Sequence, residues 1–149
     1  MALAGTKNIL VLQYFGLDAD DDLSIAPCET GPEPYMRSGS HPDIVERLWN
    51  QIGVSLPEDC RCRVGHCPAL AHPKTKIIFG LAMGTQYAIR LPPPLIPEAL
   101  KAGAKTSTVW GLKNNFDLGS ILGADWIFGA WLPVEVDWCR FAYESAGAA

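Results

Sequence analysis

The sequence lacks any apolar run long enough to cross a bilayer. The longest such stretch near its start runs from Ile9 to Leu12 and continues to Tyr14 and Phe15 after an interruption at Gln13. A transmembrane helix needs about 20 mostly apolar residues. The stretch also lacks a small-residue cleavage site before the acidic residues that follow it, so it does not indicate a secretory signal. We therefore expect a cytoplasmic protein without a membrane partner.

A cluster of basic residues is also missing. Residues 39–149 carry ten Lys or Arg, dispersed along the sequence and balanced by ten Asp or Glu. Proteins that neutralise several phosphates need grouped cations, so we expect no nucleic acid partner. The whole net charge of -4 belongs to residues 1–38, which hold six acidic and two basic residues.

Paired cysteines and the common catalytic motifs are absent as well. The number of cysteines is odd, and a chain of this size can fold without disulfide bonds, so we expect reduced thiols. The five cysteines are Cys28, Cys60, Cys62, Cys67 and Cys139. The sequence contains no phosphate-binding glycine loop, HExxH or GxSxG pattern. The acidic run from Asp18 to Asp22 lacks the glycine and the distant Glu of a calcium-binding loop.

What is present suits one folded unit. A length of 149 residues with 48% hydrophobic residues is typical of a single domain with its own core. The pattern predicts an α+β domain over 1–149, with a mostly antiparallel sheet of about five strands and two main helices packed on it. Residues 18–38, rich in proline and acids, are predicted to form a flexible acidic loop or arm.

The first half of the chain shows one strand and one helix. Residues 6–17 are rich in β-formers and end at a glycine, which predicts a strand. A helix is predicted from Ser40 to Gly53, because its apolar residues recur at helical spacing; they are Ile44, Val45, Leu48, Trp49 and Ile52.

A hairpin is predicted at the centre of the sheet. Lys76–Met83 and Gln86–Leu91 are β-rich and are joined by Gly84 and Thr85. Side chains alternate along a strand, so odd-numbered residues from Ile77 to Met83 should face one way and even-numbered residues the other. Neither set is polar. We therefore expect both strands to be covered on both faces.

The remaining elements are shorter. Strands are predicted over 60–64, 105–111 and 124–129, and a helical turn over 97–102 that Gly103 closes. A last helix follows Pro133, with an apolar stripe of Val134, Trp138 and Phe141. We expect this stripe to pack on the sheet face that carries Trp126 and Phe128.

One segment gathers potential metal ligands. Cys60, Cys62, His66 and Cys67 carry thiolates and an imidazole, which zinc prefers, and His72 follows shortly after. The spacing differs from that of structural zinc sites, and Cys60 and Cys62 would share one face of a strand. The alternatives are a zinc site, a reactive thiol with a histidine base, or cysteines that only pack in the core. We expect no cofactor.

Other residues are candidates for binding. Arg90 lies among apolar neighbours, so it either pairs with an acid or faces a cleft that also gathers His41 and His72. Four tryptophans, Trp110, Trp126, Trp131 and Trp138, lie close in the sequence and either form a stacking platform or fill the core. We take Arg90, His41, His72 and Trp131 as the candidate binding residues.

These observations favour a small cytoplasmic binding or regulatory protein that docks a basic protein partner and has no catalytic activity. The indication is the acidic start of the chain beside a neutral remainder, because opposite charge guides docking. The alternative is a metal- or thiol-dependent enzyme that uses the segment from Cys60 to His72.

Overall fold

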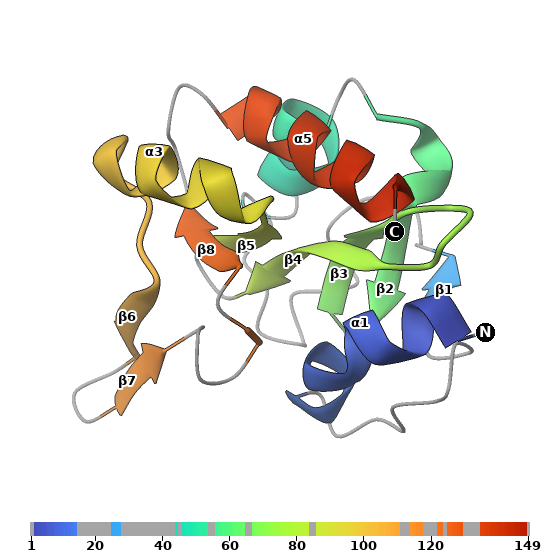
Figure 1. The fold of residues 1–149 in the computed structure, drawn as a ribbon, viewed down its shortest axis with the longest axis horizontal. Helices are drawn as coiled ribbons and strands as arrows, with labels where there is room; N and C mark the ends of the chain where they lie inside the picture. Colours follow the sequence, from blue (N-terminus) through green and yellow to red (C-terminus); the bar gives the residue numbers. More distant parts are fainter. Residues whose placement is uncertain are drawn as a thin grey trace.

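The computed structural model describes residues 2–14, 25–27, 44, 46–53, 56–64, 67–83, 86–110, 114–117, 122–123, 125–129 and 135–148. Figure 1 shows the arrangement of its elements. The helices are α1 (Ala2–Tyr14), the π-helix η3 (Arg47–Ile52), the 3-10 helices η4 (Glu58–Cys60) and η5 (Pro93–Leu95), α3 (Ile96–Lys101) and α5 (Glu135–Gly147). The strands are β1 (Ile25–Pro27), β2 (Arg61–Val64), β3 (Cys67–Ala71), β4 (Ile78–Met83), β5 (Gln86–Arg90), β6 (Ser107–Trp110), β7 (Asn114–Asp117) and β8 (Trp126–Gly129).

The strands form a six-stranded sheet in the order β1-β2-β3-β4-β5-β8, and β6 and β7 pair separately. Every neighbouring pair in the larger sheet is antiparallel. The predicted α+β class with a mostly antiparallel sheet is therefore confirmed. None of the helices in the described ranges has the length and apolar character that crossing a membrane requires.

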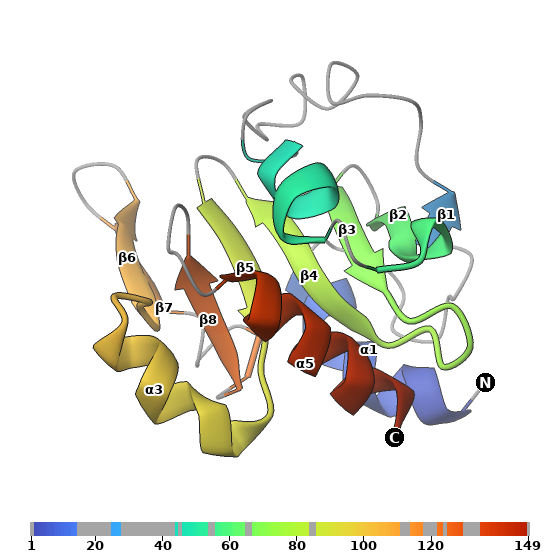
Figure 2. The same cartoon turned by 90° about the horizontal axis from the view of Figure 1, so that it is seen from above.

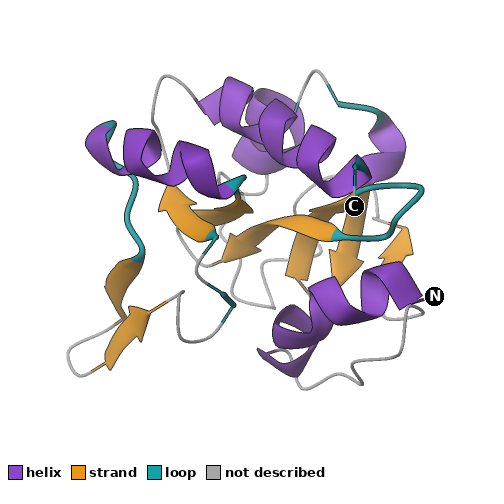
Figure 3. Ribbon diagram, in the orientation of Figure 1, coloured by secondary structure: helices purple, strands orange, loops and turns teal. Residues whose placement is uncertain are grey.

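Helices cover both faces of the sheet (Figures 1, 2 and 3). Helix α5 and η3 lie over one face and α1 over the other. We call the buried cluster on the first face the α5-side core; it includes Leu48, Trp49, Leu70, Phe79, Tyr87, Ile89, Ile127, Trp138 and Cys139. The α1-side core includes Val11, Leu12, Cys62, Val64, Cys67, Ile78, Leu81, Trp126 and Phe128.

The strand predicted over residues 6–17 was wrong, because Ala2–Tyr14 form helix α1. Among residues 8–14, where burial is described, the buried ones are Asn8, Val11 and Leu12, which are spaced by three and four positions. That spacing places them on one helical face toward the sheet. The apolar run suggested a strand because both periodicities fit so short a stretch.

The hairpin is confirmed as the pair β4 and β5, although residues 84 and 85 lie outside the described ranges. The expected alternation fails within β4. Ala71 pairs with Ile78 and Leu70 with Gly80, so Phe79 is an extra residue in a β-bulge. Beyond the bulge the phase reverses: Phe79 belongs to the α5-side core, whereas Leu81 belongs to the α1-side core.

The predicted helical turn after the proline cluster is confirmed as α3. Gly103, with φ 113°, follows it. The Ala104 amide donates to the Ala99 carbonyl and the Gly103 amide donates to the Leu100 carbonyl, which satisfies two terminal carbonyls. The helix predicted to end at Gly53 does end there, but its described last turn has π-type bonding.

Helix α5 is docked, but on the face opposite to the one expected. Trp138 lies in the α5-side core with Ile127, while Trp126 and Phe128 point to the α1-side core. Successive β8 side chains alternate, so the two aromatic residues cannot share a face with Ile127. Phe141 is exposed, and Ala142 and Ala146 replace it in the buried stripe; Val134 lies outside the described residues.

Three strands went unrecognised in the sequence. Ile25–Pro27, within the span expected to be a loop, form β1 and pair with β2 at the sheet edge. The rest of 18–38 lies outside the described residues. Cys67–Ala71 form the fully buried β3, and Asn114–Asp117 form β7. A proline suits β1 because an edge strand tolerates a missing amide donor.

Phe79→Ala tests the centre of this fold. Phe79 is fully buried at the bulge. Its truncation should lower the free energy of unfolding by about 3–5 kcal/mol, because it leaves a cavity. The matched control is Phe141→Ala on the outer side of α5, which should change it by less than about 0.5 kcal/mol. Urea unfolding measures both, and equal losses would contradict this packing.

Candidate functional site

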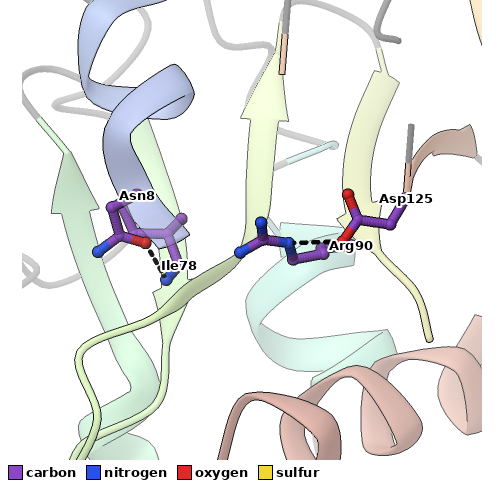
Figure 4. Close-up of polar contacts among 4 residues, drawn as sticks. All are labelled: Asn8, Ile78, Arg90 and Asp125. Carbon is purple, nitrogen blue, oxygen red and sulfur yellow. Dashed lines mark hydrogen bonds and ion pairs between the residues drawn. The ribbon is translucent and has the colours of Figure 1, made fainter. Parts of the chain in front are cut away.

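Arg90 pairs with an acid, as one of the two interpretations of the sequence predicted. Its Nε donates to Oδ2 of Asp125 at 3.0 Å, as Figure 4 shows. The backbone reinforces the pair, because the Leu91 amide donates to the Asp125 carbonyl at 2.8 Å. The exposed fractions of the two side chains are 19% for Arg90 and 32% for Asp125. The ion pair therefore reaches the surface at the end of β5.

Trp126 lies beside this ion pair. It is the β8 residue paired with Arg90, and the guanidinium carbon of Arg90 lies 5.9 Å from the centre of its ring. The Nη1 of Arg90 and the Nε1 of Trp126 are both buried, and neither has a hydrogen-bond partner in the part of the chain that the structure describes. A buried donor left unpaired costs about 1–3 kcal/mol. Two such donors in neighbouring residues mark this position as unusual.

Gly123 borders the same position. A Cβ placed on Gly123 would lie 3.3 Å from Oδ1 of Asp125 and 3.8 Å from both Cδ1 of Trp126 and Cδ1 of Leu10. Cδ1 is bonded to the indole nitrogen, so the N–H edge of Trp126 lies near Leu10 of α1. Leu10 is 43% exposed. An exposed apolar side chain, a carboxylate oxygen and the N–H edge of Trp126 therefore lie close together, and Arg90 lies against the Trp126 ring.

His72 has a structural environment. Its ring stacks on Tyr143 of α5, with 4.8 Å between ring centres. Its Nδ1 accepts from the amides of Lys74 at 3.1 Å and Thr75 at 3.4 Å. Burial, and then the charge of Lys74, lower the pKa of His72. A neutral ring with an occupied Nδ1 lone pair is the form that this turn requires.

The turn that follows His72 is also joined to the end of α5, through Thr75. Thr75 donates its hydroxyl to the Ala146 carbonyl at 3.1 Å and accepts from the Ile77 amide at 3.3 Å. The His72 and Ile77 backbones are joined by a 3.0 Å bond. These contacts belong to the α5 side of the sheet, whereas Arg90 lies against Trp126 on the α1 side. Arg90 and His72 therefore do not line one cleft.

The four described cysteines are buried, and three of them have raised pKa values. Burial raises the pKa of Cys67 and Cys139 to about 12 and that of Cys60 to about 11. The Cys67 thiol donates to the Ala82 carbonyl at 3.2 Å. Cys60 lies in the α5-side core and Cys62 in the α1-side core, so the expectation that they share one face was wrong. Cys60 ends η4 rather than belonging to the strand.

The metal hypothesis gains no support from this arrangement. Within the described ranges no group of three or more His, Cys, Asp or Glu side chains could hold a metal ion. His66 lies outside those ranges, as do Cys28 and the candidate binding residues His41 and Trp131. Of the clustered tryptophans, Trp126 and Trp138 are buried in opposite cores, so these two do not form a common platform.

The sequence did not point to three residues of the site. Leu10 was assigned to a strand, Asp125 lay within the strand predicted over 124–129, and no pattern singled out Gly123. The charge of Arg90 implied an acidic partner, but Asp125 is 35 positions away and only the β5–β8 pairing brings it near. Comparison with known proteins finds no family model, no curated protein and no solved structure that matches this chain.

The lowered pKa of His72 predicts how stability depends on pH. Unfolding returns His72 to a pKa of about 6.5, so the unfolded chain binds the proton more readily. The contribution of neutral His72 to the free energy of unfolding is complete above that pKa. It is lost as the pH falls through 6.5 toward the lower pKa of the folded protein. Urea unfolding at about pH 8 and about pH 5 measures the loss.

The matched control for this experiment is His72→Asn. An Asn side chain keeps an acceptor for the Lys74 and Thr75 amides but does not titrate. The variant should therefore lose less stability than the original protein over the same pH interval. An identical pH dependence in both proteins would contradict the role assigned to His72.

Buried, protonated thiols should also be inert. In a Cys28→Ser background, almost none of the four described thiols of the native protein should react with Ellman's reagent at about pH 8, since the thiolate is the reacting form. When the same protein is unfolded in urea, all four thiols should react within minutes. Rapid labelling of native Cys60 or Cys67, located by mass spectrometry, would instead favour a thiol-dependent activity.

Proposed function

We propose that this chain is a small binding or regulatory protein that docks a basic protein partner and carries out no chemistry of its own. The observation that carries the proposal is the outer side of α1. Leu10 and Tyr14 are one helical turn apart and are exposed by 43% and 40%. Six acidic residues of 1–38 follow this helix in the sequence, against one further basic residue.

An apolar contact surrounded by negative charge suits a basic partner. Apolar surface supplies most of the favourable free energy of association, and charges around it increase the association rate and select the partner. Asp125 adds a partly exposed carboxylate close to Leu10. The acidic residues that follow α1 in the sequence carry the same sign of charge as Asp125.

The groups that could serve catalysis are engaged in structure instead. Burial keeps the thiols of Cys60, Cys67 and Cys139 protonated. The Nδ1 of His72 accepts from two backbone amides. A nucleophile needs a lowered pKa and a free base nearby, and these residues have the opposite properties. This supports a docking role over the enzyme that uses Cys60 to His72.

Site-specific photo-cross-linking tests the proposal. A photoreactive phenylalanine analogue replaces Leu10 in one variant and Phe141 in the control, because Phe141 is exposed on the opposite helix layer. In cells that express the protein, position 10 should cross-link to one basic protein and position 141 should not. Equal cross-linking at both positions, or a product that is an acidic protein, would overturn the proposal.

The purified pair then tests the electrostatic part. Raising the salt from about 0.05 M to about 0.5 M should lower the association rate about tenfold or more, because salt screens exposed charges. Changing Asp20, Asp21 and Asp22 to Asn should lower it at low salt and leave the melting temperature unchanged. A rate independent of both changes would show that charge does not guide docking.

A further inference from the structure

The most unusual polar groups in the described chain are the unpaired donors of Arg90 and Trp126. The Nε1 of Trp126 belongs to a fully buried side chain, and Nη1 of Arg90 is buried beside it. Nε of Arg63 is likewise buried without a partner among the described residues, but Arg90 and Trp126 are paired across β5 and β8, so their two donors belong to neighbouring residues. Asn8, by contrast, makes two hydrogen bonds and His72 accepts two. Folded proteins rarely leave buried donors without an acceptor, so these two require an explanation.

The surroundings indicate which acceptor suits them. The charge of Arg90 is already balanced by Asp125 at 3.0 Å, so an additional anion would meet a neutral pair and a nearby carboxylate. An uncharged carbonyl oxygen avoids that repulsion and still accepts from both N–H groups. A peptide carbonyl is the commonest such group on a protein surface.

The same position offers contacts for the neighbouring side chains of a peptide. Oδ2 of Asp125 is taken by Arg90, whereas Oδ1 lies near Gly123 and Leu10. A Lys or Arg of the peptide can donate to Oδ1, and an apolar residue can pack on Leu10. Gly123 has no side chain, so its backbone leaves open the space beside Oδ1 of Asp125, where a Cβ would lie only 3.3 Å away.

We propose that Arg90 and Trp126 donate hydrogen bonds to a backbone carbonyl of a basic peptide segment, with Asp125 binding its cation and Leu10 its apolar side chain. This rests on the proposed docking function and names the partner segment: extended, with lysine or arginine next to an apolar residue. The two donor atoms are shielded in the unbound chain, so docking displaces a covering side chain.

The indole N–H signal of Trp126 reports this contact directly. A Trp126→Phe variant identifies the signal in the nitrogen–proton spectrum of the labelled protein. The probe is a capped hexapeptide of alternating lysine and leucine, and the control peptide has glutamate in place of lysine. The lysine peptide should shift the Trp126 signal downfield in a saturable manner, and the glutamate peptide should not.

Matched variants separate the contacts while Trp126 stays as the reporter. Arg90→Lys keeps the charge beside Asp125 but removes the Nη1 donor, and it should weaken binding of the lysine peptide about tenfold. Arg140→Lys, on the exposed side of α5, is the control and should not change the binding of the lysine peptide. Asp125→Asn should reduce the preference for the lysine peptide over the glutamate peptide.

The outcomes distinguish this inference from the proposed function. Cross-linking at position 10 together with an unshifted Trp126 signal would leave the docking role standing and overturn the carbonyl contact. A saturable shift that Arg90→Lys and Arg140→Lys weaken equally would overturn it too. A saturable shift without any cross-link at position 10 would support the peptide site and remove the proposed function.

Discussion

The side-chain amide of Asn8 holds the two layers of the molecule together. It is fully buried, donates to the Lys76 carbonyl at 2.8 Å and accepts from the Ile78 amide at 2.9 Å. These backbone groups flank Ile77, immediately before β4 begins at Ile78, and without Asn8 they would be buried and unpaired. The position and rotation of α1 follow from this contact, which directs Val11 toward the sheet and leaves Leu10 outside. The proposed docking surface thus depends on the two hydrogen bonds of Asn8, which precedes Leu10 by two positions.

The β-bulge at Phe79 is the second constraint, and it directly follows Ile78, the residue whose amide donates to Asn8. Phe79 and Gly80 both face the α5-side core, because the extra residue changes the phase of the strand. A Cβ on Gly80 would lie 3.2 Å from Leu70 and 3.4 Å from Leu48, so glycine lets η3 approach the sheet closely. Asn8 fixes the strand before the bulge, and the ladder to β5 fixes it afterwards. The side chains of β4 therefore alternate between the two faces in one register before the bulge and in the opposite register after it.

These two constraints explain how far the sequence could predict the fold. The hairpin, the end of η3 at Gly53 and the closure of α3 by Gly103 follow from local signals, and they were predicted. The helix α1 was missed because its short apolar run fits either periodicity, and the hydrogen bonds that decide the question join Asn8 to residues about 70 positions away. The face that receives α5 was missed because it depends on the phase of β8 in the sheet. In the candidate site, the charge of Arg90 required an acid, but only strand pairing specifies Asp125.

The distribution of satisfied polar groups also separates structural residues from the candidate site. Asn8, His72 and Cys67 are buried, and each has hydrogen bonds that lock a turn, a helix end or a strand. A change at these residues acts through stability, since it leaves backbone groups unpaired. Arg90 and Trp126 differ, because their buried donors lack an acceptor within the described chain while their neighbours Leu10 and Asp125 reach the surface. Folded proteins rarely leave two neighbouring buried donors without an acceptor, and a partner that supplies the acceptor when it docks accounts for this cost.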